Sequence, residues 1–320
     1  MTTSPHEQIK LKDNFVDAPL ITVGLTCFNA EASIARALRS ASSQDWPNTE
    51  IIVVDDGSID GSVELVRSFA ETDDRVRLIV HEANQGYPSA LNSIIANARG
   101  SFVAFFDDDD ESRPDRLSLQ YRRIVDYETA SGASLVACYT SRTVVLADGS
   151  RGSVSCIGRR EPSPHGVAVA DFLLLHEVGV SFVFGAFGSC TLMARRSTFE
   201  AVGPFDTEFR RCAEWDWAVR LAFMDGHFIG VDAPLLTQYV TRTTDKAGRL
   251  PLHYALLLRR RKKAYLARKR LYNYARVMAH LRFYYAKERT ILFRLCLLAG
   301  FLLAPRRMWQ HVRAYRRVKT

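Results

Sequence analysis

The chain has 320 residues, 47% of them apolar by type, and a formal net charge of +8. A chain of this length can bury a sizeable core as one large domain or two modest ones. Its spread of apolar and aromatic residues excludes long disorder, and its length excludes a small disulfide scaffold. The six cysteines form no Cys-x-x-Cys pair, so we expect reduced thiols in a cytoplasmic protein.

We expect neither a leader nor a membrane-spanning helix. The first twenty residues are polar and mixed in charge, without the apolar stretch of a signal peptide. The one long apolar run, residues 291–304, is interrupted by Arg294 and is shorter than the roughly 20 residues that a spanning helix needs.

Charge divides the chain into two parts. Residues 251–320 hold 19 Lys and Arg but a single acidic residue, Glu288, whereas the first 250 residues hold 24 basic and 34 acidic residues. We therefore expect an N-terminal extension over residues 1–17, a folded domain over 18–250 and a basic, amphipathic helical region over 251–320.

Short apolar runs alternate with helical periods in the first half of the chain. The runs are rich in Val, Ile and Phe and predict buried strands at residues 20–25, 51–54, 76–80 and 102–106. Apolar residues spaced by three and four predict helices around residues 34–41, 63–69 and 91–98. This alternation predicts an α/β fold with a mostly parallel sheet and helices on both faces.

The second half is less regular. The turn residues Ala147 to Ser150 follow an apolar run and predict a hairpin, and residues 151–164 resemble a loop. Residues 182–193 are apolar and interrupted by glycine, which fits a strand pair or a loop lining a pocket. Residues 214–224 predict a helix, and residues after 253 are compatible with helices throughout.

Polar clusters follow three of the predicted strands. Ligands of an open parallel sheet bind at the carboxyl ends of its strands, where such clusters gather. The clusters lie at residues 26–29, 55–58 and 107–110.

The four consecutive aspartates at 107–110 carry the strongest chemical signal. So many carboxylates after a buried strand are unfavourable unless a cation or hydrogen-bond donors balance them. In an extended segment Asp107 and Asp109 would share one face, and Asp108 and Asp110 the other. Oxygen ligands of this kind suit Mg²⁺ or Mn²⁺, with substrate phosphates completing the shell. The alternative is a solvated acidic turn that caps the helix after Pro114.

Two further acidic features have both a structural and a functional interpretation. Asp55 and Asp56 precede Gly57 and could form a simple turn, or one of them could accept hydrogen bonds from a nucleoside. Glu214 and Asp216 open a helix, where the dipole favours carboxylates, or one of them could act as a general base on an acceptor hydroxyl.

Taken in order, these motifs resemble the family 2 glycosyltransferases. The resemblance spans roughly residues 18–240. It rests on ITVGLTCFNA from Ile21, VVDDGS from Val53, NQG from Asn84 with ALN from Ala90, FFDDDD ending at Asp110, PDRL from Pro114 and GPFD from Gly203. It implies a GT-A fold, a nucleotide-sugar donor, a divalent metal, Mg²⁺ or Mn²⁺, and inversion at the anomeric carbon.

Carried over by position, the resemblance implies a set of site residues. Metal binding would fall to Asp109 and Asp107. Counting back from Arg220, Glu214 stands where the family usually has its catalytic Asp, and Asp216 is the alternative base. The nucleotide-sugar contacts would come from Thr26, Phe28, Asn29, Glu31, Asp55, Asp56, Asn84, Gly86, Asp107 and Asp108.

The sequence departs from the family pattern at a few positions. Thr26 stands where the family often has Pro, and Ala213 and Glu214 replace its usual Glu-Asp pair. The signature and membrane helices of processive polymer synthases are missing, which favours single addition. We expect an inverting transferase acting in cell-surface polysaccharide or glycolipid assembly. The alternatives are a nucleotidyltransferase and a catalytically weak nucleotide-sugar-binding module.

The basic region 251–320 has three interpretations. It could be a solvated helical face packed on the domain, or it could bind nucleic acid, which the acidic body and the lack of a nucleic-acid-binding motif disfavour. The interpretation we prefer is attachment to the cytoplasmic face of a membrane, since basic groups attract anionic lipid and the apolar run 291–304 could lie in the interface. A lipid-linked sugar acceptor would then be within reach.

Overall fold

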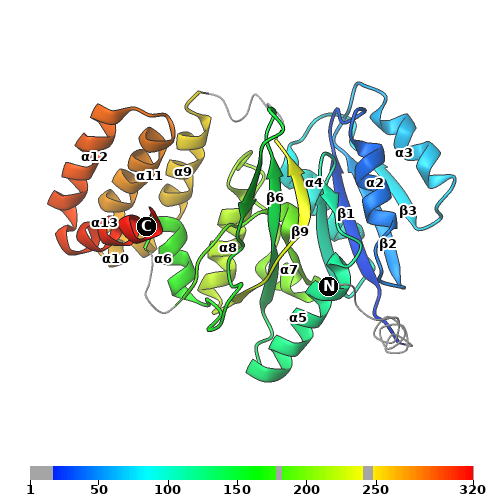
Figure 1. Ribbon diagram of the computed structural model, residues 1–320, viewed down its shortest axis with the longest axis horizontal. Helices are drawn as coiled ribbons and strands as arrows, with labels where there is room; N and C mark the ends of the chain where they lie inside the picture. The colour runs from blue at the N-terminus through cyan, green and yellow to red at the C-terminus, as the bar shows by residue number, and fades with distance from the viewer. Residues whose placement is uncertain (1–16, 178–181, 241–247, 320) are drawn as a thin grey trace.

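A nine-stranded mixed sheet forms the centre of the molecule (Figure 1). The computed structural model describes residues 17–177, 182–240 and 248–319. Eight strands follow the order β3-β2-β1-β4-β8-β6-β9-β5, and β7 pairs with β6. The strands are β1 Ile21–Cys27, β2 Thr49–Asp55, β3 Val76–Val80, β4 Phe102–Asp107, β5 Glu111–Ser112, β6 Val136–Val145, β7 Arg151–Val154, β8 Met193–Arg195 and β9 His227–Tyr239.

The parallel part of the sheet is the part that the sequence predicts most clearly. Strands β3, β2, β1 and β4 all pair in parallel, with Thr26 of β1 opposite both Val54 and Asp107. Beyond β4 the sheet is mixed, because β8 runs antiparallel to β4 and β6, while β6 and β9 are parallel. The carboxyl ends of β1, β2 and β4 therefore meet at one edge.

Helices cover both faces of this sheet, as predicted. The helices of the described residues are α2 Ile34–Ser42, α3 Ser62–Ala70, α4 Tyr87–Asn97, α5 Arg116–Ser131, α6 Val167–Leu175, α7 Arg196–Val202, α8 Ala213–Phe223, α9 Leu250–Arg261, α10 Lys263–Arg268, α11 Tyr272–Ala286, α12 Thr290–Leu303 and α13 Pro305–Lys319. One core packs α2, α3 and α5 on one face, and the other packs α4, α6, α7 and α8 on the opposite face. Along β2, Ile51 and Val53 enter the first core and Ile52 and Val54 the second, which is the alternation expected of a strand buried on both sides.

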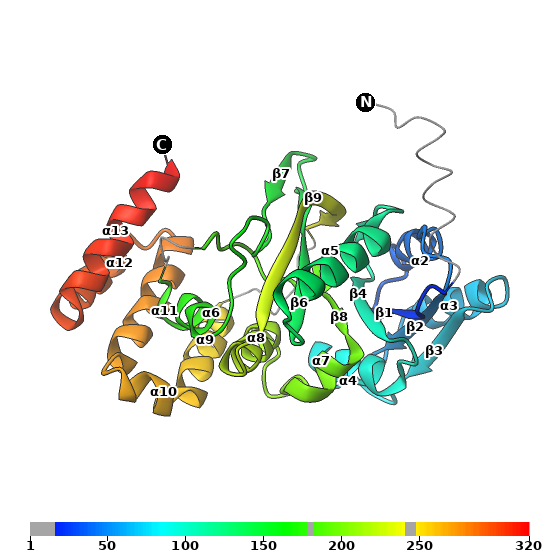
Figure 2. The same cartoon turned by 90° about the horizontal axis from the view of Figure 1, so that it is seen from below.

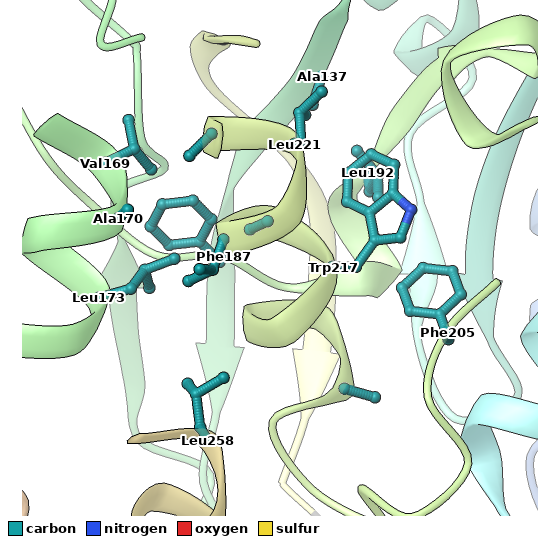
Figure 3. Close-up of a cluster of buried hydrophobic side chains, with 14 of the residues drawn as sticks. Ala137, Val169, Ala170, Leu173, Phe187, Leu192, Phe205, Trp217, Leu221 and Leu258 are labelled. Carbon is teal, nitrogen blue, oxygen red and sulfur yellow. The ribbon is translucent and has the colours of Figure 1, made fainter. Parts of the chain in front are cut away.

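Helix α8 is held against the sheet by a cluster of large apolar side chains (Figure 3). Trp217 is fully buried, and its ring lies 5.8 Å from that of Phe205 and 5.1 Å from that of Phe199. Truncating a buried side chain of this size to Ala costs about 3–5 kcal/mol of folding stability. This anchor fixes the first turn of α8, which carries Glu214.

The C-terminal helices are not a detached tail. Leu258, Leu266, Met278 and Leu281 share one core with α6 and α8, and Figure 3 places Leu258 beside them. Helices α12 and α13 form the outer edge of the molecule, at the end opposite α3 (Figures 1 and 2). Within the described ranges, every helix is too short or too polar to cross a bilayer.

The less regular predictions fare unevenly. The predicted hairpin is present, since β6 and β7 are antiparallel and the Gly149 N–H donates to the Leu146 carbonyl. The predicted loop 151–164 begins instead with β7, because its first four residues pair with β6. Residues 182–188 have no regular structure and lead into a short 3₁₀ helix, Ser189–Thr191.

Candidate active site

The turn after β2 is fixed by Asp55. Its buried carboxylate accepts hydrogen bonds from the N–H groups of Gly57 at 3.1 Å and Ser58 at 2.8 Å, and from the Ser58 hydroxyl at 2.5 Å. Gly57 has a φ of +77°, and a Cβ there would lie 2.7 Å from the Ala83 backbone. Asp55, one of the predicted nucleotide contacts, therefore stabilises the turn after β2. This is the structural interpretation that the sequence allowed beside the functional one.

Asp56 organises the neighbouring loop. Its carboxylate accepts from the N–H groups of Gln85 at 3.0 Å and Gly86 at 2.7 Å, and its Oδ1 lies 2.7 Å from His81 Nδ1. Asp56 is 3% exposed. A carboxylate has about four acceptor positions, so these three contacts leave room for one more donor. The loop that precedes α4, with the predicted contacts Asn84 and Gly86, thus depends on this side chain.

The loop after β1 is tied to the loop after β2. The Asn29 N–H donates to the Ser58 hydroxyl at 2.8 Å, and its Oδ1 accepts from the Ile59 N–H at 3.0 Å. Glu31 accepts from the Gly61 N–H at 3.2 Å. Thr26 is nearly buried, whereas Phe28 is 44% exposed and offers an aromatic face at this edge. The structure thus gathers the predicted residues of the first two strand ends.

The acidic run does not continue as a strand. Residues 108 and 109 form a turn, and the Asp110 N–H approaches the Asp107 carbonyl at 3.5 Å. The expected pairing of Asp107 with Asp109 on one face is therefore wrong, because the turn brings Asp110 back towards Asp107. Asp108 accepts from the Phe28 N–H at 2.9 Å, and burial raises its pKa to about 8.

Asp107 and Asp110 form the core of an acid cluster. One oxygen of each lies within 4.8 Å of the other and of the Cys190 sulfur. Asp107 accepts from the Tyr87 hydroxyl at 3.0 Å, while neither oxygen of buried Asp110 has a hydrogen-bond partner of good geometry, although the Tyr239 backbone N–H favours its charged form. Burial, followed by repulsion from neighbouring aspartates, raises the pKa of both carboxyl groups.

This cluster fits a hard divalent cation. Two carboxylates, one of them buried and without a hydrogen-bond partner of good geometry, are the oxygen donors that Mg²⁺ and Mn²⁺ prefer. Burial and the nearby aspartates hold the pKa of the Cys190 thiol well above its usual range, so the sulfur stays protonated and is a poor ligand. The predicted ligand Asp109 is outside this group, although its charge acts on Asp107 and Asp110.

Glu214 faces the same region from α8. It lies in the first turn of the helix and lines a cavity of about 250 Å³ with Arg142 of β6 and residues of α6 and α11. Burial raises the pKa of its carboxyl group, Arg211 opposes that rise, and the charge of Asp107 adds to it. The carboxyl groups of Glu214 and Asp107 are therefore close enough for their charges to interact.

Asp216 points elsewhere. Its carboxylate is 2.8 Å from Arg220 Nε and 2.7 Å from Lys262 Nζ, and the residue is 3% exposed. It joins α8 to the basic C-terminal region and does not line the cavity. Of the two predicted bases, Glu214 therefore has the geometry of a catalytic group, and Asp216 that of a structural ion pair.

Comparison with known proteins identifies the fold and the domain. Residues 22–166 match the family model described as glycosyl transferase family 2. The chain carries a family 2 glycosyltransferase domain. Over 117 residues, or 37% of the chain, it is 39% identical to the succinoglycan biosynthesis protein ExoO of Rhizobium meliloti. Over 122 residues, also 37% of the chain, it is 33% identical to the putative teichuronic acid biosynthesis glycosyltransferase TuaG of Bacillus subtilis. The matched segments cover 32% and 48% of these two relatives.

A structural likeness extends over more of the chain. The crystal structure of S. aureus TarS 1-349 in complex with UDP-GlcNAc aligns with a TM-score of 0.62 and covers 90% of this chain and 82% of that one. At 18% sequence identity this shows the fold, which is GT-A-like. The family match ends at residue 166, so Glu214 and the helices that contact it lie beyond the residues that the family model matches.

Several residues of the candidate site escape sequence reasoning. Arg142, His176 and Arg282 line the cavity with Glu214, yet they lie on β6, at the end of α6 and on α11. No local motif marks them, because only the tertiary fold brings them together. The acidic run marked Asp110 only weakly as a site residue. Its pairing with Asp107 depends on a turn, which the alternation of side chains along an extended strand does not predict.

Proposed function

We propose that this protein is an inverting glycosyltransferase that moves a sugar from a nucleotide-diphosphate sugar to an acceptor hydroxyl. The observation that supports the proposal is that Glu214, a buried carboxyl group on α8, is close enough to the acid cluster at the strand ends for the charge of Asp107 to act on it. The family 2 domain and the polysaccharide-assembly names of its relatives support a role in cell-surface polysaccharide or glycolipid assembly.

The chain's own groups suggest a division of labour. Glu214 accepts the proton of the acceptor hydroxyl, for which a raised pKa is useful. Asp107 and Asp110, with Asp109 beside them, would hold Mg²⁺ or Mn²⁺. A bound divalent ion neutralises charge on the diphosphate leaving group. Asp56 orders the loop of Asn84 and Gly86, and exposed Phe28 offers a surface on which a base can stack.

A donor panel tests the proposal. The purified protein is incubated with UDP-, GDP- and dTDP-sugars in Mn²⁺ or Mg²⁺, and release of the nucleoside diphosphate is measured with and without EDTA. We expect release from one nucleotide class, dependent on the metal. Release of pyrophosphate from a nucleoside triphosphate and a sugar phosphate would favour a nucleotidyltransferase. Binding of a nucleotide sugar without any release would favour a binding module.

Attachment to a membrane surface is a second proposal, and α12 supports it. Its side chains Ile291, Leu295, Leu298 and Leu302 recur at helical spacing and are 57–78% exposed. The next helix, α13, begins at Pro305 and carries exposed Arg306 and half-exposed Trp309, while Arg307 pairs with Glu177. An exposed apolar stripe next to basic side chains and a Trp suits the interface of an anionic membrane.

Co-sedimentation with liposomes tests this attachment. Deleting residues 251–320 would damage the shared core, so point variants of the full chain are preferable. We expect the wild type to pellet with anionic vesicles and the double variant Leu295→Gln/Leu298→Gln to stay in solution. The matched control is Leu65→Gln/Val80→Gln, which alters two exposed apolar residues at the other end of the molecule. Equal pelleting of all three proteins would rule out α12 as the contact. The proposed location at the cytoplasmic face of the membrane would then lose its support.

A further inference from the structure

The cavity beside Glu214 has a basic wall on the side of the C-terminal helices. Arg142, His176 and Arg282 line it together with Trp215, while Phe172, Leu173 and Phe187 supply apolar surface. Arg282 is an exposed residue, so this end of the cavity opens to solvent. A volume of about 250 Å³ lies just below the range typical of pockets for drug-sized ligands. The cavity therefore has room for one small group beside Glu214.

His176 is held between two guanidinium groups. Its Nε2 lies 3.2 Å from Arg259 Nη2, and its Nδ1 lies 3.5 Å from Arg282 Nη1. Burial and these neighbouring cations hold the pKa of His176 well below its usual value, so the ring is neutral. A neutral imidazole has one N–H and one acceptor nitrogen, and guanidinium groups only donate. One imidazole N–H therefore faces a guanidinium with no acceptor between them.

The surroundings of Arg259 indicate which nitrogen this is. Arg259 is fully buried, and its Nε and Nη1 donate to the carbonyls of Ala275 at 2.7 Å and Ala255 at 2.8 Å. Its Nη2 makes the shorter of the two contacts to the imidazole, which favours Nε2 as the acceptor and the proton on Nδ1. The Nδ1–H and Arg282 Nη1 are then two donors 3.5 Å apart that lack a common acceptor.

Among the described residues, no carboxylate pairs with Arg259 or Arg282, whereas the charge of Arg142 acts on Asp107 and Asp110. Within the described ranges, none of the ion pairs involves Arg142, Arg259 or Arg282. Arg282 instead lies over the Trp215 ring, 5.4 Å from its centre. A buried cation without a counter-charge, such as Arg259, is unfavourable, and the guanidinium of an exposed Arg such as Arg282 is well suited to carboxylate and phosphate oxygens. The arrangement is therefore complementary to an anion.

The two ends of the cavity differ in their charged neighbours. The charge of Arg142 acts on Asp107 and Asp110, so that end adjoins the proposed donor site. The groups that act on His176 are Arg259, Arg282 and His311, all of them basic. Because the His176 end lacks acidic neighbours of this kind, it suits a group other than the metal-bound diphosphate.

We propose that the acceptor carries an anionic group, a phosphoryl or a carboxylate, next to the hydroxyl that reacts, and that His176 Nδ1–H and Arg282 bind this group while Glu214 receives the hydroxyl. The inference rests on the proposed function, because it assigns the acceptor half of the same site. Arg259 is a positioning residue, since it fixes the His176 tautomer and does not line the cavity.

Calorimetry on the full chain tests the inference with three small probes. Glycerol 1-phosphate supplies a phosphoryl group, glucuronic acid a carboxylate, and glucose neither. We expect saturable binding of at least one anion and none of glucose, and the anion that binds identifies the chemical class. Arg282→Gln should weaken that binding at least tenfold. Arg276→Gln, which alters an exposed Arg on the same helix outside the cavity, should leave it unchanged.

Nucleotide binding is measured in parallel, with UDP, GDP and dTDP in Mn²⁺. We expect Arg282→Gln to bind the nucleotide like the wild type, which also shows that the variant is folded. The inference is overturned if neither anion binds a protein that binds nucleotide, if Arg282→Gln keeps full anion affinity, or if the nucleotide displaces the anion. Anion binding that depends on Arg282 in a protein that binds no nucleotide would support the anion site and count against the proposed transferase.

Discussion

At the strand ends the site consists of carboxylates that are close together in sequence, whereas at the helical end it consists of cations that are far apart. Asp107 and Asp110 come from one turn after β4. Arg142, His176 and Arg282 come from three elements spread over 140 residues of sequence. Glu214 lines the cavity with these cations, and the charge of Asp107 acts on it. The proposed donor half is thus a local motif, and the proposed acceptor half is a product of tertiary packing.

The largest effect is expected where the two halves meet. Glu214→Gln keeps the size of the side chain but removes the proton acceptor. We expect turnover to fall by about 10²–10⁴-fold, the usual contribution of a general base. Nucleotide affinity measured by calorimetry should stay within a few-fold of wild type. Near-normal turnover would assign the base elsewhere.

Asp110→Asn tests the strand-end half. Since burial and the neighbouring aspartates disfavour the charged form of this carboxyl group, which has no hydrogen bond of good geometry, its loss should not lower the thermal unfolding midpoint in metal-free buffer. Metal-dependent nucleotide binding should weaken at least tenfold, because an amide is a poorer ligand for a hard cation than a carboxylate. A fall in apo stability together with unchanged metal dependence would show that Asp110 is a structural residue.

Asp216→Asn separates the two acidic residues of α8. Removing its charge leaves Lys262 without a partner in a nearly buried position. We expect the free energy of unfolding in urea to drop by about 1–3 kcal/mol. At a temperature where the variant is folded, kcat should stay within about threefold of wild type, in contrast to Glu214→Gln. A larger loss of kcat without a loss of stability would make Asp216 the base.

The smallest effect concerns the pH profile. A base must be deprotonated, so activity is lost as the pH falls through the pKa of Glu214, which burial raises above 4.5. Arg211 counteracts this rise. In Arg211→Gln the acidic limb of kcat/KM should therefore move to higher pH. A limb that moves to lower pH, or stays in place, would assign it to another group.

The sequence predicts those parts of the structure that depend on interactions between residues close together in the chain. Strands β1 to β4 and their helices are predicted well, because local periodicity and a buried strand pattern determine them. The strand-end residues are predicted as a set, since parallel strands deliver their carboxyl ends to one edge. Yet Asp55 and Asp56 turn out to hold loops, and Asp110 joins Asp107 only through a turn.

The helical half was largely beyond prediction. Arg259 and Lys262 belong to a charge run that looks solvent-exposed, but the fold buries the first fully and pairs the second with Asp216. Such partners depend on how α9 and α11 pack on α6 and α8. This packing produces no residue spacing that could be recognised in the sequence. The helical character of residues 251–320 was predicted, and the apolar run at 291–304 foreshadowed the exposed apolar stripe of α12.

The most direct test of the central claim is anomalous scattering from Mn²⁺ in crystals grown with the nucleoside diphosphate that the donor panel identifies. The account predicts a metal peak bonded to oxygens of Asp107 and Asp110, with the diphosphate directed towards the cavity of Glu214. A metal bound elsewhere, or a nucleotide on a surface that Glu214 does not reach, would contradict it.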